Sequence, residues 1–340
     1  VRQKEGGLLM ELLSELKLHH PISVEDAVSL HAAAPTGRYL AGGSDLLVNV
    51  RRGIEQPGSL VYLDNIAELQ SITDAPDQIT IGAGVTLREL ANSALVHEHF
   101  AAVAQAAGEV AGPSHREYGT LGGNLCLDTR CVFYNQSEWW RAANNYCLKS
   151  RGDICHVAPG GKKCFAAFSG DVAPALLLFD AEVELAGPSG RRRMALAELY
   201  RNDGMDHLTL ETGELLVAVH VAKPSVPVTS AYAKSRVRGS IDFPLAGVAL
   251  RMAMRDGRIA ELRVGLTGVS PLPFLAGKLD KFIGRAPDQA CLEDLRDAIR
   301  SQAKAMKTTV TPPHYRRRVA GALTLKLAQR LAQDLVEASS

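Results

Sequence analysis

Cysteines are concentrated in one stretch of this chain, and they constrain its local fold more than any other feature. Five of the six lie in a single segment, at Cys126, Cys131, Cys147, Cys155 and Cys164. The sixth, Cys291, stands far from them. The same segment holds both tryptophans of the chain and lacks the alternation of apolar and polar residues that is typical of strands. We therefore predict an irregular insertion inside a globular fold.

Such a dense group of cysteines indicates a metal site, because thiolates bind both zinc and iron–sulfur clusters. Structural zinc sites favour C-x₂₋₄-C pairs, whereas the gaps here are 5, 16, 8 and 9 residues. A [4Fe–4S] cluster needs four thiolates and suits this spacing better, and Gly152, Gly160 and Gly161 would let a loop wrap around it. Buried free thiols that act as small apolar groups are the simpler alternative. One thiol is in excess, and spacing alone does not identify it.

Length and charge exclude several classes of protein. A chain of 340 residues corresponds to about two domains. With 38 basic and 37 acidic residues, the charge is too balanced for a nucleic-acid-binding surface. No apolar run is long enough to span a bilayer, and the stretch from Leu8 to Leu13 is too short and too acidic for a signal peptide. We expect a cytoplasmic protein with no membrane insertion, in which residues 1–9 are an extension.

Helices and strands are expected to alternate along the chain. Ser23 begins a helix that Pro35 ends, and Thr86 with Glu89 begins another. Further helices are expected over 100–107, 173–178, 288–306 and 315–338. Strands are expected over 60–63, 79–84, 181–185, 215–221 and 244–254. A domain boundary is expected between residues 187 and 230.

Two glycine pairs are candidate ligand-binding loops. They lie in Ala41-Gly42-Gly43-Ser44-Asp45 and in the turn Thr120-Leu121-Gly122-Gly123-Asn124. Glycine lacks a Cβ, so the backbone can approach a pyrophosphate closely and offer it successive N–H groups. Neither loop matches G-x-G-x-x-G, and a plain tight turn is the simpler interpretation of each. Two such loops in one chain favour a shared dinucleotide.

Four segments together resemble the flavin subunits of the xanthine oxidase and carbon monoxide dehydrogenase family. The segments are 40–46, 119–125, 170–176 and 234–242. The resemblance implies an α+β fold: a two-part FAD-binding domain of the vanillyl-alcohol-oxidase/xanthine-oxidase type, and a C-terminal domain of antiparallel sheet and helices. It implies a first segment over 1–20, an FAD-binding domain over 21–225 with a Cys-rich insertion over 126–168, and a C-terminal domain over 226–340. By matched position, the FAD-binding residues would be Leu40, Ala41, Gly42, Gly43, Ser44, Asp45, Leu46, Gly119, Thr120, Gly123, Asn124, Asp171, Leu216 and Lys234.

The insertion departs from the usual family pattern, in which about ten residues join the positions of Asn124 and Asp171. It looks like the insertion in the flavin and iron–sulfur subunits of 4-hydroxybenzoyl-CoA reductases. There, four cysteines at gaps of 16, 8 and 9 hold a [4Fe–4S] cluster, and these gaps fall here on Cys131, Cys147, Cys155 and Cys164. Cys126 would then be spare and lie against the flavin loop, and Cys291 would be structural.

No residue pattern in the chain activates a substrate, so we expect no catalytic residue and assign the chemistry to cofactors. The resemblance implies a large subunit with a molybdenum cofactor, a small subunit with two [2Fe–2S] clusters, and ferredoxin as electron donor. Electrons would pass from ferredoxin through the [4Fe–4S] cluster and FAD toward reductive dehydroxylation of 4-hydroxybenzoyl-CoA. Trp139, Trp140 and Tyr146 are candidate residues for shielding the cluster, or simply a small core for the insertion.

Two other interpretations remain open from the sequence. The first keeps FAD but places zinc, or no metal, in the insertion of an oxidative molybdenum hydroxylase subunit. The second is a non-catalytic, zinc-stabilised interaction module in which the insertion serves as a docking surface. Bound flavin would reject the second, and a broad brown absorption beyond the flavin bands would reject the first.

Overall fold

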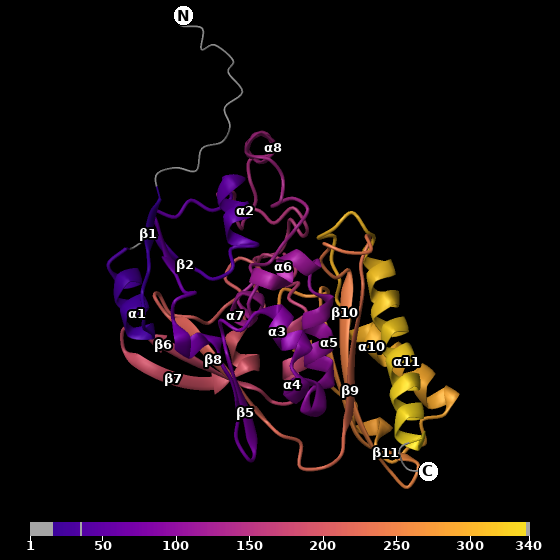
Figure 1. Cartoon of the computed structure of the whole chain (residues 1–340). Helices are drawn as coiled ribbons and strands as arrows, with labels where there is room; N and C mark the ends of the chain where they lie inside the picture. Colours follow the sequence, from indigo (N-terminus) through magenta and orange to yellow (C-terminus); the bar gives the residue numbers. More distant parts are fainter. Residues whose placement is uncertain (1–15, 35, 338–340) are drawn as a thin grey trace, which may run out of the picture.

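The computed structural model describes residues 16–34 and 36–337, so the expected extension over residues 1–9 lies outside the described residues. Three sheets and their helices make up the described chain (Figure 1). The first sheet is parallel, in the order β1 (Lys17–His19), β3 (Ser59–Tyr62) and β2 (Gly37–Leu40). Helix α1 (Val24–Ala32) connects β1 to β2, and the Ser23 side chain accepts a hydrogen bond from the Asp26 N–H at its start.

The second sheet is antiparallel and carries the largest core. Its order is β4 (Ile72–Asp74), β5 (Gln78–Gly82), β8 (Leu215–Ala222), β6 (Glu182–Gly187) and β7 (Gly190–Ala195). The core is completed by α3 (Leu87–Asn92), α4 (Ala94–His99), α5 (Ala101–Glu109) and α9 (Val172–Leu177). Helix α5 is rich in buried alanines, whose small side chains let neighbouring elements pack closely against it.

The third sheet has helices on both faces. It is antiparallel, in the order β12 (Phe274–Leu275), β11 (Arg258–Thr267), β10 (Ala246–Arg255) and β9 (Thr229–Ser235). Helices α10 (Gln289–Gln302) and α11 (Pro313–Glu337) pack on one face and bury a second core there. Helices α5 and α9 contact the strands of this sheet on the face opposite α10 and α11 (Figure 1). The two large cores therefore lie next to each other across the sheet.

The remaining helices are short. They are α2 (Leu46–Arg51), α6 (Pro113–Tyr118), α7 (Leu121–Leu125), α8 (Glu138–Ala143) and the 3₁₀ turns Ala67–Gln70, Leu196–Leu199 and Asp280–Phe282. Between α7 and α9, α8 is the one helix of the predicted insertion, and it lies at the top of Figure 1. A bridge between Arg130 and Ala167 joins the two ends of the insertion. A 2.7 Å bond from the Val132 N–H to the Thr308 carbonyl ties the insertion to the body.

The expected α+β class is confirmed, and the expected helices and strands are present within a few residues of their predicted bounds. Two details differ. The second glycine pair is not an open turn, because Thr120 caps it as the short helix α7 by accepting a bond from the Gly123 N–H. Gly187 and Gly190, proposed near a boundary, instead turn the β6–β7 hairpin inside the second sheet.

Candidate cofactor sites

The two glycine loops lie against each other. A Cβ on Gly42 would overlap the Tyr118 carbonyl, so a side chain at this position is excluded by backbone atoms. Gly43 adopts a φ of 68°, in the left-handed region that favours glycine. A Cβ on Gly122 would lie 3.0 Å from the Ala83 carbonyl oxygen. The glycines therefore allow the close packing of segments that are far apart in the sequence.

A cavity of about 970 Å³ opens beside these loops; we refer to it as the flavin cavity. Thirteen of the fourteen predicted FAD-binding residues line it: Leu40, Ala41, Gly42, Gly43, Ser44, Asp45, Leu46, Gly119, Thr120, Gly123, Asn124, Asp171 and Leu216. The cavity is large enough for a dinucleotide-sized ligand. The structure thus brings these residues together, and their role in binding FAD stays a prediction.

The fourteenth residue, Lys234, lies behind the cavity wall. Its side chain is 1% exposed, and its ammonium lies 3.1 Å from Oδ2 of Asp171. The Tyr232 hydroxyl donates a 2.6 Å bond to Oδ1 of the same carboxylate. Burial raises the pKa of Asp171, and the Lys234 charge and the Tyr232 hydroxyl act against that rise. Lys234 therefore positions Asp171 and does not line the cavity.

The four predicted cluster ligands line a second, smaller cavity, the cysteine cavity. Cys131, Cys147, Cys155 and Cys164 are all buried, and all six cysteines of the chain are free of disulfides. The cavity holds about 10 Å³, so a cluster requires the cysteine side chains to move outward. The segment around them is largely irregular backbone, which permits such an adjustment.

The arrangement of the thiols bears on the metal. A zinc site needs its ligands to converge on one ion, and no three metal-binding side chains of the described residues converge in this way. A [4Fe–4S] cube instead attaches each thiolate to a different iron atom. The described structure places four thiols around one small cavity, and their binding of a cluster stays a prediction.

The two spare cysteines lie elsewhere. Cys126 lines the flavin cavity, as expected, and Cys291 is buried in the core beneath α10. None of the proposed shielding residues Trp139, Trp140 and Tyr146 lines the cysteine cavity. Trp139 is 79% exposed, so it neither shields a cluster nor forms a small core for the insertion. The aromatic residues that line it are Phe133, Tyr134 and His156.

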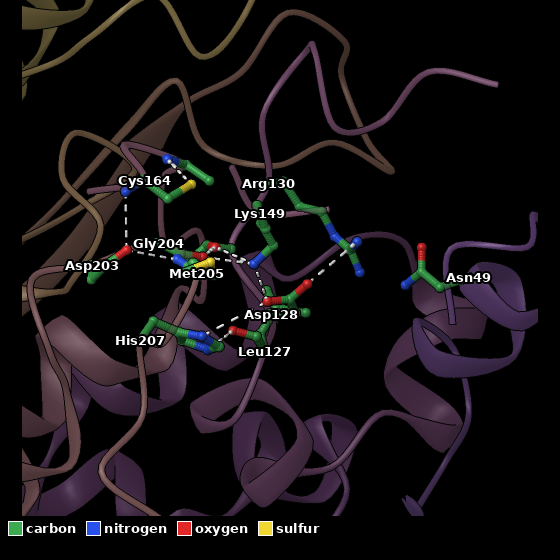
Figure 2. Close-up of polar contacts among 12 residues, drawn as sticks. Asn49, Leu127, Asp128, Arg130, Lys149, Cys164, Asp203, Gly204, Met205 and His207 are labelled. Carbon is green, nitrogen blue, oxygen red and sulfur yellow. Dashed lines mark hydrogen bonds and ion pairs between the residues drawn. The ribbon is translucent and has the colours of Figure 1, made fainter. Parts of the chain in front are cut away.

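Charged residues that the sequence did not single out join the two cavities. The Lys149 ammonium donates to Oδ1 of Asp128 at 2.6 Å, to Oγ1 of Thr129 at 2.7 Å and to the Gly204 carbonyl at 2.7 Å (Figure 2). Arg130 donates a 2.6 Å bond to Oδ2 of Asp45 in the first glycine loop, while its Nη1 is buried and makes no hydrogen bond to the described residues. Nη1 lies 3.8 Å from Oδ2 of Asp128.

Another buried cation, Arg316, lies near Cys131. Arg316 at the start of α11 is 1% exposed and donates to the carbonyls of Leu245, Met306 and Gly268 and to Oγ1 of Thr308. It forms no ion pair with a carboxylate of the described residues. Burial lowers the pKa of Arg316 to about 10, and the nearby Cys131 acts against this.

Comparison with known proteins agrees with this geometry. Residues 14–224 match the model of the FAD binding domain in molybdopterin dehydrogenase, and residues 230–331 match the CO dehydrogenase flavoprotein C-terminal domain. Among curated proteins, the aldehyde oxidoreductase FAD-binding subunit of Escherichia coli K12 is 32% identical over 71% of this chain and 77% of its own length. The carbon monoxide dehydrogenase medium chain of Afipia carboxidovorans is 28% identical over 92% of this chain and 95% of its own.

Solved structures give the same fold. A chain of the Cu,Mo-CO dehydrogenase superposes with a TM-score of 0.77 at 24% identity, covering 95% of this chain and 99% of that one. Quinoline 2-oxidoreductase from Pseudomonas putida 86 gives 0.77 at 20% identity with the same coverage. No helix of the described residues is long and apolar enough to cross a membrane. An FAD-binding fold overturns the interpretation as a non-catalytic interaction module, and the chain belongs to the FAD-binding subunits of the xanthine dehydrogenase and CO dehydrogenase family.

Proposed function

We propose that this chain is the FAD and [4Fe–4S] subunit of a molybdenum-containing 4-hydroxybenzoyl-CoA reductase. The observation that supports the proposal is that Cys131, Cys147, Cys155 and Cys164 all line one small cavity next to the flavin cavity. Tyr134 and Lys149 line both cavities, so one layer of side chains separates them. Two electron carriers on either side of so thin a wall would form a relay.

The residues of this chain would bind and insulate the cofactors. The glycine loops offer backbone N–H groups and close approach to the FAD pyrophosphate and ribityl chain. Asp171, oriented by Tyr232 and Lys234, presents a fixed carboxylate at the cavity wall. The four cysteines would hold the cluster, and Phe133 and Tyr134 would exclude water from it. The cofactors supply electron transfer, the cluster by single electrons and FAD by one or two.

The partner subunits and the direction of electron flow are part of the same proposal. Relatives are described as medium chains or FAD-binding subunits, which indicates that they work in multi-chain enzymes. We propose a large molybdenum subunit and a small subunit with two [2Fe–2S] clusters as partners, with ferredoxin as the donor. Electrons would enter through the [4Fe–4S] cluster, pass to FAD and leave for the small subunit, and the large subunit would remove the phenolic hydroxyl to give benzoyl-CoA.

The second candidate is an oxidative molybdenum hydroxylase whose insertion holds zinc or is purely structural. The names of the relatives favour it, because they include xanthine dehydrogenase, nicotinate dehydrogenase and nicotine 6-hydroxylase subunits. In such an enzyme, electrons would leave through FAD to an acceptor. The insertion would then add stability and carry no electrons.

Cofactor analysis of the anaerobically purified complex tests the proposal. We expect about four iron and four acid-labile sulfide on this chain beside one FAD, after the iron of the partner subunits is accounted for. Zinc without sulfide would establish the oxidative alternative. With the cluster present, 4-hydroxybenzoyl-CoA and a reduced low-potential donor form the first substrate pair to assay, and failure to form benzoyl-CoA would overturn the proposed substrate.

A further inference from the structure

Lys149 occupies a special place between the two cavities, because it lines both of them. Its side chain is 5% exposed, and its three N–H bonds are satisfied by Asp128, Thr129 and the Gly204 carbonyl (Figure 2). A buried ammonium with all its donors satisfied is held in one position. The wall between the cavities therefore contains a fixed positive charge.

Carboxylates screen the Lys149 charge more on the flavin side of the wall than on the cysteine side. Asp128, which pairs with Lys149, lines the flavin cavity together with Asp45 and Arg130. No carboxylate among the described residues lines the cysteine cavity, where Lys149 is the one lysine or arginine. The Lys149 charge therefore acts on the cysteine cavity with less screening than on the flavin cavity.

We infer that Lys149 tunes the reduction of the cluster held by the four cysteines, with Asp128 limiting its effect. The inference rests on the proposed function, since it requires a cluster in this cavity. Adding one electron to a cluster adds one negative charge, and a fixed cation nearby stabilises the reduced form. Because screening is weaker on the cysteine side, the same ammonium favours an electron on the cluster more than an electron on the flavin.

Redox titration of the anaerobic holo-complex, followed by the electron paramagnetic resonance signal of the reduced cluster and by flavin absorbance, tests this. In Lys149→Met, we expect the ratio of reduced to oxidised cluster at a fixed potential to fall about tenfold, which is about 59 mV for a one-electron couple. The flavin should shift in the same direction by less. Lys149→Arg keeps the charge and should stay within about threefold of the wild type.

Lys223→Met is the matched control. Lys223 also pairs with an aspartate at 2.6 Å, Asp74, but it lines neither cavity. Its loss should leave both potentials unchanged. A shift in this control equal to that in Lys149→Met would mean a general effect of losing any lysine and would overturn the inference.

Asp128→Asn supplies a test of opposite sign. Without the Asp128 carboxylate, the positive charge of Lys149 is less screened, so the reduced fraction of the cluster at a fixed potential should rise. Shifts of the same sign in Lys149→Met and Asp128→Asn, or no shift in Lys149→Met, would overturn the inference. If Lys149→Met holds no cluster while Lys149→Arg does, the cluster requires the positive charge at this position, which supports the inference. If both variants lose the cluster, Lys149 has only a structural role, and the inference is overturned. Absence of iron and sulfide in the wild type is a different result, since it rejects the proposed function itself.

Discussion

The flavin cavity and the cysteine cavity share a wall but are built in different ways. The flavin cavity is assembled from distant stretches of chain, among them 37–49, 119–128, 205–216 and 238–243, and its tightest contacts are between glycines and backbone. The cysteine cavity is lined entirely by residues between Cys131 and Ala166. The first is shaped by the three-sheet fold, whereas the second depends on one irregular segment. The flavin cavity therefore rests mainly on the fold, whereas the cysteine cavity rests on the insertion alone.

The largest expected effect is the loss of one cofactor without the other. Cys147→Ser should remove the iron of this chain and leave FAD bound, because the residues around the flavin cavity lie mostly outside the insertion. Iron and flavin content of the purified complex measure both. Cys291→Ser is the control, since Cys291 is buried in the core beneath α10, and it should keep both cofactors. Joint loss of iron and FAD in Cys147→Ser would show that the cavities are not independent.

The next effect concerns the buried ion pair between Asp171, at the wall of the flavin cavity, and Lys234 behind it. Asp171→Asn leaves the Lys234 ammonium buried without its carboxylate, which costs about 3–5 kcal/mol in the free energy of unfolding. Urea denaturation of the FAD-free protein measures the loss. A double variant, Asp171→Asn with Lys234→Met, should recover part of it because no charge is then left unpaired. Equal free energies of unfolding in the single and double variants would mean that the unpaired Lys234 ammonium does not destabilise the protein.

A smaller effect comes from the backbone of the first glycine loop. Gly42→Ala places a Cβ against the Tyr118 carbonyl and should cost about 1–3 kcal/mol, with FAD affinity reduced roughly tenfold or more. Iron content should stay unchanged. Gly160→Ala, in the insertion, is the control because no atom lies within 4 Å of its added Cβ. FAD titration of both variants decides whether the close approach matters.

Local patterns in the sequence predicted much of the fold. Ser23 and the capping box of Thr86 and Glu89 begin helices as expected. Strand β7 was missed because Arg191, Arg192 and Arg193 cover an exposed strand, and exposed strands show no apolar alternation. Strand β11 was missed although Leu262, Val264 and Leu266 show the apolar alternation of a strand, with Arg263 on the opposite face.

The candidate sites were predicted unevenly, for a physical reason. Glycine pairs and cysteine spacing are local signals, and the residues they indicated do gather around two cavities. Lys149 and Arg316 carry no local signal, because their importance comes from burial beside segments that are distant in sequence. In particular, Arg316 stands in a run of three arginines, Arg316-Arg317-Arg318, yet it is 1% exposed.

The smallest expected effect is a pH dependence that belongs to the cysteine cavity. Burial raises the pKa of Cys164 from 9.0 to about 12, and burial likewise raises the pKa of Tyr134 from 10.0 to about 12. The unfolded chain therefore loses these protons at lower pH than the folded chain does. Both groups stabilise the cluster-free protein fully below pH 9, and that stability falls as the pH rises toward 12.

Urea denaturation of the cluster-free protein at pH 8 and pH 10 measures this loss, which we expect to be about 1 kcal/mol after allowing for partial solvation. Cys164→Ala should remove the Cys164 share of it, since the thiol then no longer titrates in either state. Cys126 in the flavin cavity, whose pKa burial also raises to about 12, keeps its own share in this variant. A cluster holds its cysteines as thiolates, so the loaded protein should lack the Cys164 contribution altogether. The pH dependence would belong to groups outside the cysteine cavity if the free energy of unfolding changed with pH equally in Cys164→Ala and in the wild type. The same would follow if it changed equally with and without iron. Either result would remove this distinction between the two cavities.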